Sequence, residues 1–313
     1  MSAGFRNCHP WVSVVFFMSV IAFGMFVMHP ACLLPSFIFA CAYDIRLKGK
    51  KSAGRLFLFV IPMIAFVTAV NTLFSHYGVT VLLQTKGGNN ITFEAMINGL
   101  ITGVAAVSVI IWFFCFNEVV TADKIMSVLS FLSPKAALMI SMALRFVPLY
   151  RKKYAEIAQV QKASGADTGS VINKIKNAVS CVSILITWSL ENAVETSDSM
   201  KARGYGSKGR TSYSRFVFTR QDLLLIVLIA AADITVAFAA LTGGLYCSYN
   251  PYVMINSPAQ FSVTYILTDI NAVINPFTPS GIAAAAAYFL LCAMPLIIDA
   301  KEGLKWRRLK SKI

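Results

Sequence analysis

Long apolar runs alternate with short polar segments along most of this chain. Five runs approach or exceed the roughly 20 apolar residues with which a helix crosses a bilayer. They are Trp11–Met28, Leu56–Phe74, Phe93–Phe116, Leu223–Leu241 and Ile282–Ile298. A shorter run, Ala31–Tyr43, could be re-entrant or tilted, but we count it as a span because the distribution of positive charge requires an even number of crossings before Asp44. The pattern predicts an all-α membrane protein with about six transmembrane helices.

Residues 117–221 break this pattern. The segment is too polar to span a membrane, too long for a connection and too apolar to be disordered. We predict a short helix over 121–132, a second over 135–163 and a third over 170–203, the last about 50 Å long at 1.5 Å per residue. The three regions of the chain are therefore 1–116, with N-terminal transmembrane helices, 117–221, a coupling domain, and 222–313, with C-terminal transmembrane helices.

The third of these helices carries an apolar stripe. Its members recur at helical spacing: Val171, Ile175, Val179, Val182, Leu185 and Ile186. Such a stripe fits a helix that packs against a partner helix or lies beneath a membrane. The short turn over 165–169 joins this helix to the one before it, so we expect two long crossed helices that form an interaction platform.

Composition and charge support a membrane protein and set its orientation. The chain is 57% hydrophobic and 13% charged, with a net charge of +14, against roughly 45–50% and about 25% in soluble domains. Of the 28 lysines and arginines, all but Lys86 lie at the N-terminus or in three segments: 44–55, 117–221 and the basic tail 301–313. This asymmetry predicts that both termini are cytosolic and that loops 75–93 and 243–280 are extracytoplasmic. The basic character then reflects attraction to membrane lipid, and nucleic acid is not an expected partner.

Two matches to phosphate-binding loops fail on context. Gly204–Gly209 satisfies G-x-G-x-x-G, and with Arg210 and Thr211 it falls one residue short of a P-loop. Both motifs need a preceding strand and a following helix, whereas a long predicted helix precedes these glycines. We interpret them as a helix cap followed by a flexible basic turn.

No catalytic, cofactor or metal site is predicted. The sequence holds no H-E-x-x-H, no G-x-S-x-G and no C-x-x-C pair among its seven cysteines. The isolated histidines His9, His29 and His76 flank predicted spans, where capping a helix or contacting headgroups is favoured over metal binding. Asp233 lies inside a span and is a functional candidate by default. The favoured interpretation is that it faces the protein interior, either protonated or bonded to a neighbour such as Thr235 or Asn71.

Two predicted helix ends carry the most specific pattern. Leu144-Arg145-Phe146-Val147-Pro148 lies inside the second long helix, where Pro148 is expected to cause a kink. That helix ends in Lys162-Ala163-Ser164-Gly165, and the third ends in Lys201-Ala202-Arg203-Gly204. Over about 121–222 the chain resembles the transmembrane T component of energy-coupling factor (ECF) transporters, the family that includes the membrane subunit of cobalt and nickel uptake systems.

The resemblance implies a docking mechanism. In this family two coupling helices each end in a short motif centred on arginine, and each arginine inserts into a groove on one of two cytosolic ATPase subunits, which form a homo- or heterodimer. Arg203, flanked by Ala202 and Gly204, would be one docking residue. The other motif reads Ala163-Ser164-Gly165 and lacks the arginine, so Lys162 is a candidate substitute as a point charge. Arg145, Phe146 and Pro148 would be structural residues of the coupling helices.

The expected function is that of a non-catalytic T component in the cell membrane of a prokaryote. It would couple ATP hydrolysis by separate subunits to uptake of a vitamin or transition-metal ion through a separate substrate-binding S component. The alternative is a self-contained secondary transporter or channel, which would need a cluster of polar residues within the spans and an internal repeat. A membrane-embedded enzyme would need a catalytic cluster, which the sequence lacks.

Overall fold

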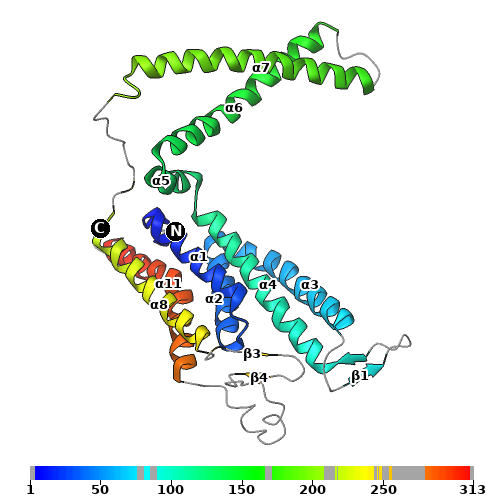
Figure 1. The fold of residues 1–313 in the computed structure, drawn as a ribbon, viewed down its shortest axis with the longest axis vertical. Helices are drawn as coiled ribbons and strands as arrows, with labels where there is room; N and C mark the ends of the chain where they lie inside the picture. The colour runs from blue at the N-terminus through cyan, green and yellow to red at the C-terminus, as the bar shows by residue number, and fades with distance from the viewer. Residues whose placement is uncertain are drawn as a thin grey trace, which may run out of the picture. The chain divides into compact units, whose positions relative to one another are not determined.

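The chain folds into two compact units. A computed structural model describes residues 4–75, 81–84, 90–165, 171–207, 216, 218–242, 245, 247–248, 254–255 and 279–310. One unit, called here the membrane unit, comprises Met1–Ala122 and Val217–Ile313, and the other, the crossed-helix unit, comprises Asp123–Phe216. Figure 1 shows the elements of both.

The membrane unit is built from apolar helices. They are α1 (Pro10–Phe26), α2 (Pro30–Lys48), α3 (Lys50–Phe74), α4 (Phe93–Val119), α8 (Arg220–Leu241) and α11 (Pro279–Lys310), after a short 3-10 helix, η1 (Phe5–Asn7). Within the described ranges, all of these α-helices except α1 are long and apolar enough to cross a membrane, and α1 is an apolar helix of 17 residues. The prediction of an all-α membrane protein is confirmed.

Two of the basic segments are helical. The loop expected over 44–55 is wrong, because α2 continues to Lys48 and α3 begins at Lys50. Only Gly49 separates them, with φ at 80°, a conformation that glycine adopts without steric cost. The basic tail is also helical as far as Lys310. The error has a physical cause: apolar length marks the thickness of the bilayer, whereas a helix continues until a residue such as Gly49 ends it.

Two short hairpins lie within the predicted extracytoplasmic loops. β1 (Val81–Gln84) pairs antiparallel with β2 (Asn90–Thr92), with Leu83 opposite Ile91. β3 (Cys247–Ser248) pairs with β4 (Met254–Ile255) in the same sense. Most of the loop over 243–280 lies outside the described residues.

Two histidines cap the first two helices. His9 and His29 each precede a proline at the first helical position, and the side-chain Nδ1 of each accepts a backbone N–H, from Trp11 at 3.3 Å and from Ala31 at 3.2 Å. The arrangement satisfies one of the backbone donors that a helix N-terminus leaves without an intrahelical partner. Capping is therefore confirmed for these two, while His76 lies outside the described residues.

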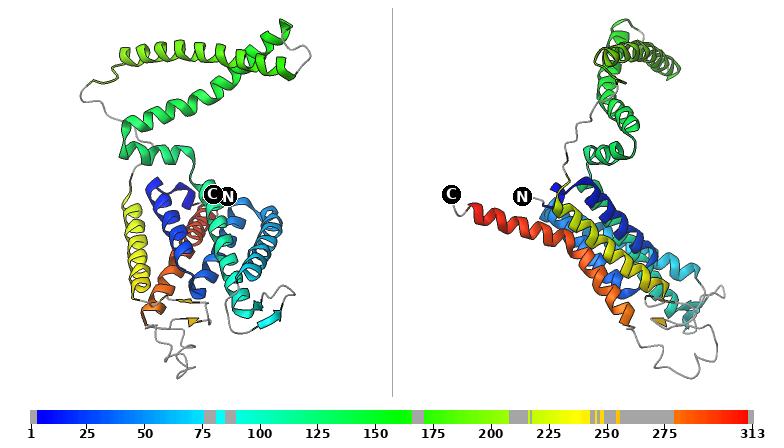
Figure 2. Two further views of the ribbon diagram at one scale, coloured as in Figure 1. Left: turned by 45° about the vertical axis from the view of Figure 1, so that its right-hand side comes forward. Right: turned by 60° about the vertical axis from the view of Figure 1, so that its left-hand side comes forward.

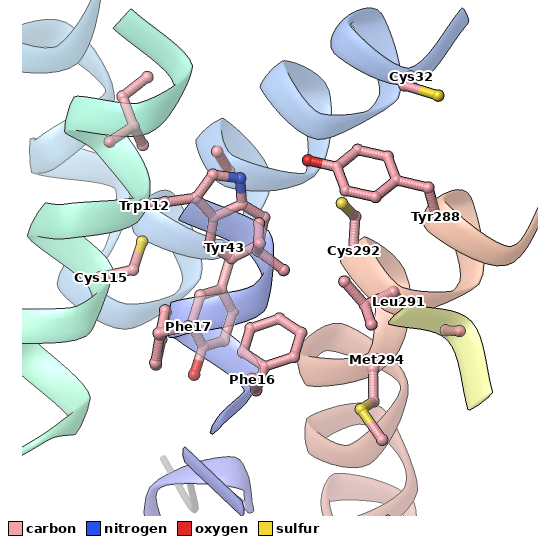
Figure 3. Packing of buried hydrophobic residues seen from close by; sticks show 14 of the residues in the cluster. Phe16, Phe17, Cys32, Tyr43, Trp112, Cys115, Tyr288, Leu291, Cys292 and Met294 are labelled. Atoms are coloured by element: carbon pink, nitrogen blue, oxygen red, sulfur yellow. The ribbon is translucent and has the colours of Figure 1, made fainter. Parts of the chain in front are cut away.

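The core of the membrane unit centres on Trp112 of α4, which is 1% exposed. Its ring meets Phe16 and Phe17 of α1 edge-on, with centroids 5.8 and 6.2 Å away. Its Nε1 donates to Ser36 Oγ of α2 at 3.0 Å, and the hydroxyl of Tyr288 on α11 lies 3.3 Å from the same oxygen. Figure 3 shows the rings of Phe16, Phe17, Trp112 and Tyr288 in one region of the interior, where Ser36 takes part in two polar contacts of an otherwise apolar core.

The pairing of α3 with α4 depends on glycines. A Cβ on Gly99 would lie 3.0 Å from the carbonyl oxygen of Thr68, and one on Gly103 would lie 3.3 Å from that of Ile64. Small residues spaced four apart allow two membrane helices to approach this closely.

A hydrogen bond joins η1 to α11, the first and last helical elements of this unit. The ring of Phe5 is wholly buried, and its backbone N–H donates to Asp299 Oδ1 of α11 at 2.8 Å. Arg46 of α2 places Nε 3.6 Å from the other oxygen of the same carboxylate. Asp299 therefore joins η1, α2 and α11.

The crossed-helix unit contains α5 (Ala122–Leu132), α6 (Pro134–Ala163) and α7 (Val171–Ala202). These bounds agree with the predicted helices to within one residue. Ser133 caps α6, accepting the N–H of Ala136 at 3.5 Å, and α6 continues through Pro148. Figures 1 and 2 show α6 and α7 crossing, which confirms the prediction of two long crossed helices and one short one.

Candidate functional site

Two polar contacts join α6 and α7 where they cross. Gln161 Nε2 donates to Ser180 Oγ at 3.0 Å, and the thiol of Cys181 donates to Gln161 Oε1 at 3.2 Å. Cys181 and Ile157 are 4% and 9% exposed, the lowest values that α6 and α7 reach apart from Ala137. One glutamine therefore uses both ends of its amide to fix the relative position of the two helices.

An aromatic row makes the second contact of the crossing. Trp188 of α7 meets Tyr150 of α6 edge-on at 5.9 Å, and Lys153 Nζ lies 5.6 Å from the centre of the Trp188 ring. Phe146 stacks on Tyr150 at 5.7 Å. The crossing thus involves side chains that lie roughly two to four turns from Gln161 along α6.

Of the three residues expected to be structural, the structure connects one to the crossing. Phe146 reaches it through Tyr150. The Arg145 guanidinium lies 5.8 Å from the centre of the Phe146 ring, and both Arg145 and Pro148 are exposed. Gln161, Cys181 and Trp188 were not predicted as site residues, although the four-residue spacing of Phe146 and Tyr150 is a visible signal of an aromatic pair on one helix face.

The end of α6 is closed by a glycine with positive φ. Gly165 has φ at 76°, and its N–H donates to the carbonyl of Lys162 at 3.1 Å. Ser164, the C-cap residue, donates its backbone N–H and its hydroxyl to the carbonyl of Val160, both at 3.0 Å. The Ser164 side chain is therefore turned back to its own helix.

The end of α7 has the same geometry. Gly204 has φ at 75°, and its N–H donates to the carbonyl of Lys201 at 2.9 Å. The N–H of Tyr205 donates to Met200 at 3.0 Å, which completes a Schellman motif with Arg203 as the C-cap residue. The interpretation of Gly204 as a helix cap is confirmed, and the C-terminal part of the glycine motif, at Gly209, lies outside the described residues.

The two ends present their docking candidates to solvent. Lys162, Ala163, Ser164 and Gly165 are exposed, as are Lys201, Ala202 and Arg203, and Gly204 is half-buried. Lys162 lies two residues before Ser164, and Lys201 lies two residues before Arg203. Both ends therefore carry a lysine at the same position, so Lys162 does not replace the charge of Arg203. The α6 end therefore carries one positive charge fewer in an equivalent backbone.

The predicted apolar stripe of α7 lies on the surface. Val171, Ile175 and Val179 are 72%, 61% and 64% exposed. The side chains that cross α6 lie on another face of the helix, at Cys181 and Trp188. The stripe is therefore open to a partner or to lipid, as the pattern predicted.

Asp233 has a different partner from those expected. Ser19 of α1 donates its hydroxyl to Asp233 Oδ2 at 2.6 Å, and Asp233 is half-buried. The expected partners are engaged elsewhere, since the Thr235 hydroxyl donates to the carbonyl of Ala232 and the amide oxygen of Asn71 accepts the hydroxyl of Ser75. The predictions of Thr235 and Asn71 are wrong because helix packing brings α1 against α8. Across the described residues, no three His, Cys, Asp or Glu side chains are grouped as a metal ion would require.

Known proteins resemble this chain at the level of sequence. Residues 6–213 match the model of the CbiQ family, described as cobalt transport protein. A Streptococcus thermophilus protein named energy-coupling factor transporter transmembrane protein EcfT is 38% identical over 97 residues, which are 30% of this chain and 37% of that protein. The protein of the same name from Brevibacillus brevis is 26% identical over 191 residues, 58% of this chain and 70% of that protein.

These matches differ in how much of each protein they cover. The chain spans little more than a third of the Streptococcus protein and 36% of the EcfT of Bacillus subtilis, to which it is 37% identical over 94 residues. The family match is broader, extends from η1 to beyond the end of α7, and therefore includes both helix ends. The resemblance to T components that those ends indicated is confirmed. The chain belongs to the CbiQ family of cobalt transport proteins.

Proposed function

We propose that this chain is the transmembrane T component of an ECF-type importer, a scaffold that couples ATP hydrolysis by separate subunits to substrate uptake. The observation that carries the proposal is the pair of capped helix ends on α6 and α7. Both are exposed, both end in left-handed glycines, and they lie on crossed helices within the segment that matches the family. The relatives' names are those of transporter membrane components, which supports a role without catalysis of its own.

The chemistry of Arg203 suits it for docking an ATPase. A guanidinium offers a planar fork of donors that pairs with carboxylates in two parallel hydrogen bonds. At the C-cap it lies beyond the last helical turn, and the small neighbours Ala202 and Gly204 leave room for a partner surface.

The crossing supplies the rigidity that coupling requires. If ATP-driven closure moves the two ends, the Gln161 contact with Ser180 and Cys181 makes α6 and α7 respond as a connected pair. The exposed stripe of α7 gives the same unit an apolar surface for a membrane-embedded partner. We assign that partner to the substrate-binding S component and the transported compound to a vitamin or a transition-metal ion.

Charge supports the orientation of the proposed scaffold. The crossed-helix unit and the basic C-terminal segment carry most of the lysines and arginines, which favours a cytosolic location for both termini and for the two helix ends. That side of a prokaryotic cell membrane is where ATP is available. The alternative of a self-contained transporter or channel has Asp233 as its main candidate, and Asp233 bonds Ser19 across two helices of the membrane unit.

Substitution of Arg203 tests the proposal. Arg203→Ala removes the guanidinium and leaves the backbone cap of α7 in place, so recovery of ATPase subunits with the tagged chain should fall at least about tenfold and uptake should be lost. The matched control is Arg151→Ala, which removes an exposed arginine from α6 away from either end. Membrane insertion should be unchanged in both variants. Equal ATPase recovery and transport in the Arg203 variant and the control would contradict the proposal.

A further inference from the structure

The chain joins the crossed-helix unit to the membrane unit through two helices that are packed to different degrees. Along the chain α4 precedes the crossed-helix unit and α8 follows it. One side of α4 is wholly buried at Val107, Ile111 and Cys115. In the apolar stretch of α4, 44% of the residues are buried, against 22% in that of α8. A movement of the crossed-helix unit therefore reaches the membrane unit through one firmly held helix and one loosely held helix.

The buried side of α8 carries no large rings. Its buried apolar residues are small or aliphatic: Ile229, Ala232, Val236 and Ala239. On α4 the ring of Trp112 instead meets Phe16 and Phe17 edge-on. Interlocked rings resist displacement because they fit in one arrangement, whereas a face of small and aliphatic side chains slides over its neighbour with little loss of contact. The packing of α8 therefore permits a small shift that the packing of α4 opposes.

Two polar contacts hold α8 against the N-terminal part of the chain, at different depths. At the first turn of α8, Asp222 Oδ1 accepts the backbone N–H of His9 at 3.3 Å, and its other oxygen accepts the N–H of Thr219 at 2.9 Å. Eleven residues later, about 16 Å along the helix, Ser19 of α1 donates its hydroxyl to Asp233 Oδ2 at 2.6 Å. The first contact includes the cap of α8 and suits a pivot, whereas the second joins two side chains alone.

The contact of Ser19 with Asp233 satisfies only one of the two carboxyl oxygens. Oδ1 of Asp233 is buried and makes no hydrogen bond to the residues that the structure describes. Burial of a carboxyl oxygen without a partner is costly, so the contact stabilises the packing of α1 and α8 less than an apolar pair of similar size would. A hydrogen bond is also lost when its atoms separate by about 1 Å. The contact therefore defines one position of α8 and is broken by a small shift.

Resting on the proposed function, we infer that α8 shifts against α1 when the ATPase subunits bind nucleotide, and that the Ser19–Asp233 contact is broken in that step. The helix pivots near Asp222, while α4 keeps its place in the core. Asp233 is thus a positioning residue for coupling, because it holds the resting position of α8.

Pulsed electron paramagnetic resonance measures this shift without altering the contact. Spin labels are attached through an unnatural ketone amino acid, which spares the native cysteines, at Met18 and Ile234. These residues are 63% and 68% exposed and lie next to Ser19 and Asp233 in sequence. The matched pair is Met18 with Phe113 of α4, which is 52% exposed.

The full chain is purified from its own host with the subunits that accompany it, and is measured without nucleotide and with ATP plus vanadate. The distance from Met18 to Ile234 should change by roughly 2 Å or more, and that from Met18 to Phe113 should not. Unchanged distances in both pairs, or equal changes in both, overturn the inference and, with ATPase subunits present, leave the proposed function standing. A preparation without any nucleotide-hydrolysing subunit overturns the proposed function and the inference with it.

Replacement of the contact gives a second test, with a readout that a purely structural role would not give. Ser19→Ala with Asp233→Leu exchanges the half-satisfied contact for an apolar one, so the midpoint of thermal unfolding should stay level or rise by up to roughly 4 °C. Because the resting position is stabilised, the fraction of chains that shift with ATP plus vanadate should fall roughly fivefold.

The control for these variants is Thr235→Val, which removes a hydroxyl that bonds only within α8 at the carbonyl of Ala232. It should leave the shift between Met18 and Ile234 unchanged. A lower midpoint in the double variant, or a shift as large as in the unaltered chain, overturns the inference. The distance measurement on the unaltered contact needs neither variant.

Discussion

The membrane unit and the crossed-helix unit are stabilised in different ways. The membrane unit buries large side chains from several helices, with Trp112, Tyr43 and Phe16 at most 1% exposed. Among the described residues of the crossed-helix unit, the buried side chains are Lys124, Ala137, Ile157 and Cys181. Its surface meanwhile exposes residues as large as Ile172, at 75%.

This difference separates two tasks. Full burial of one large apolar side chain is worth roughly 1.5–3 kcal/mol, so the membrane unit obtains its rigidity from its own core. The crossed-helix unit buries few large apolar side chains, so its shape depends on the contacts at one helix crossing and on helical hydrogen bonds. Apolar surface that is not buried in folding remains available for partners, as the proposed coupling role would require.

Among the substitutions that test this difference, removal of the Trp112 side chain should have the largest effect on stability. Trp112→Ala leaves a cavity among α1, α2 and α4 and should lower the free energy of unfolding by about 3–5 kcal/mol. The neighbouring Phe113, which is 52% exposed, provides the control. Thermal unfolding of the purified chain in mild detergent should show a large drop for the Trp112 variant and a small one for Phe113→Ala. Equal shifts would mean that Trp112 is not the centre of the core.

Alanine substitutions at two glycines should change the free energy of unfolding in opposite directions. Gly99→Ala places a methyl group 3.0 Å from the Thr68 carbonyl, so close packing of α3 on α4 should lose roughly 1–3 kcal/mol. Gly54, inside α3 with nothing within 4 Å of its added Cβ, should gain about 0.5–1 kcal/mol. Differential scanning fluorimetry of both variants measures the two signs. A gain at Gly99 would show that the two helices do not approach as closely as described.

The elements set by local residues could be predicted from the sequence. Ser133-Pro134 is a helix start signal and Gly165 a helix stop signal, and each acts on the helix residues next to it, so the predicted bounds of α6 were correct to one residue. The break at Gly49 was missed because positive charges on both sides resemble a loop, although a single glycine suffices to end a helix. Hydropathy measures the apolar part of a helix and carries no information on where the helix ends.

The helix ends of the candidate site were predictable for the same reason, whereas the side-chain contacts at the crossing were not. Ala202, Arg203 and Gly204 are contiguous, and a glycine after a helix indicates its own cap geometry. The contact of Gln161 with Ser180 joins residues 19 positions apart, and that of Ser19 with Asp233 joins residues 214 apart. Such pairs follow from how helices pack, which periodicity alone does not determine.

The caps of α6 and α7 should be energetically equivalent. Gly165→Ala and Gly204→Ala each force a Cβ into the left-handed region, so each should destabilise its helix end by roughly 1–2 kcal/mol. Asparagine tolerates this conformation better, so Gly165→Asn and Gly204→Asn should be milder. Hydrogen exchange near residues 160–165 and 199–204 measures the effect. Clearly unequal losses would show that the two ends do not share one conformation.

The smallest expected effect lies at the crossing itself. A double-mutant cycle with Tyr150→Ala and Trp188→Ala should give a coupling of roughly 0.5–1.5 kcal/mol, because the two rings meet edge-on. Hydrogen exchange in α6 and α7 should accelerate while exchange in α4 stays unchanged, since the membrane unit has its own core. Tyr154, exposed on α6 four residues beyond Tyr150, is the control, and its pairing with Trp188→Ala should show no coupling. If hydrogen exchange in α4 also accelerated, the two units would unfold together. The membrane unit would then not be stabilised independently of the crossed-helix unit.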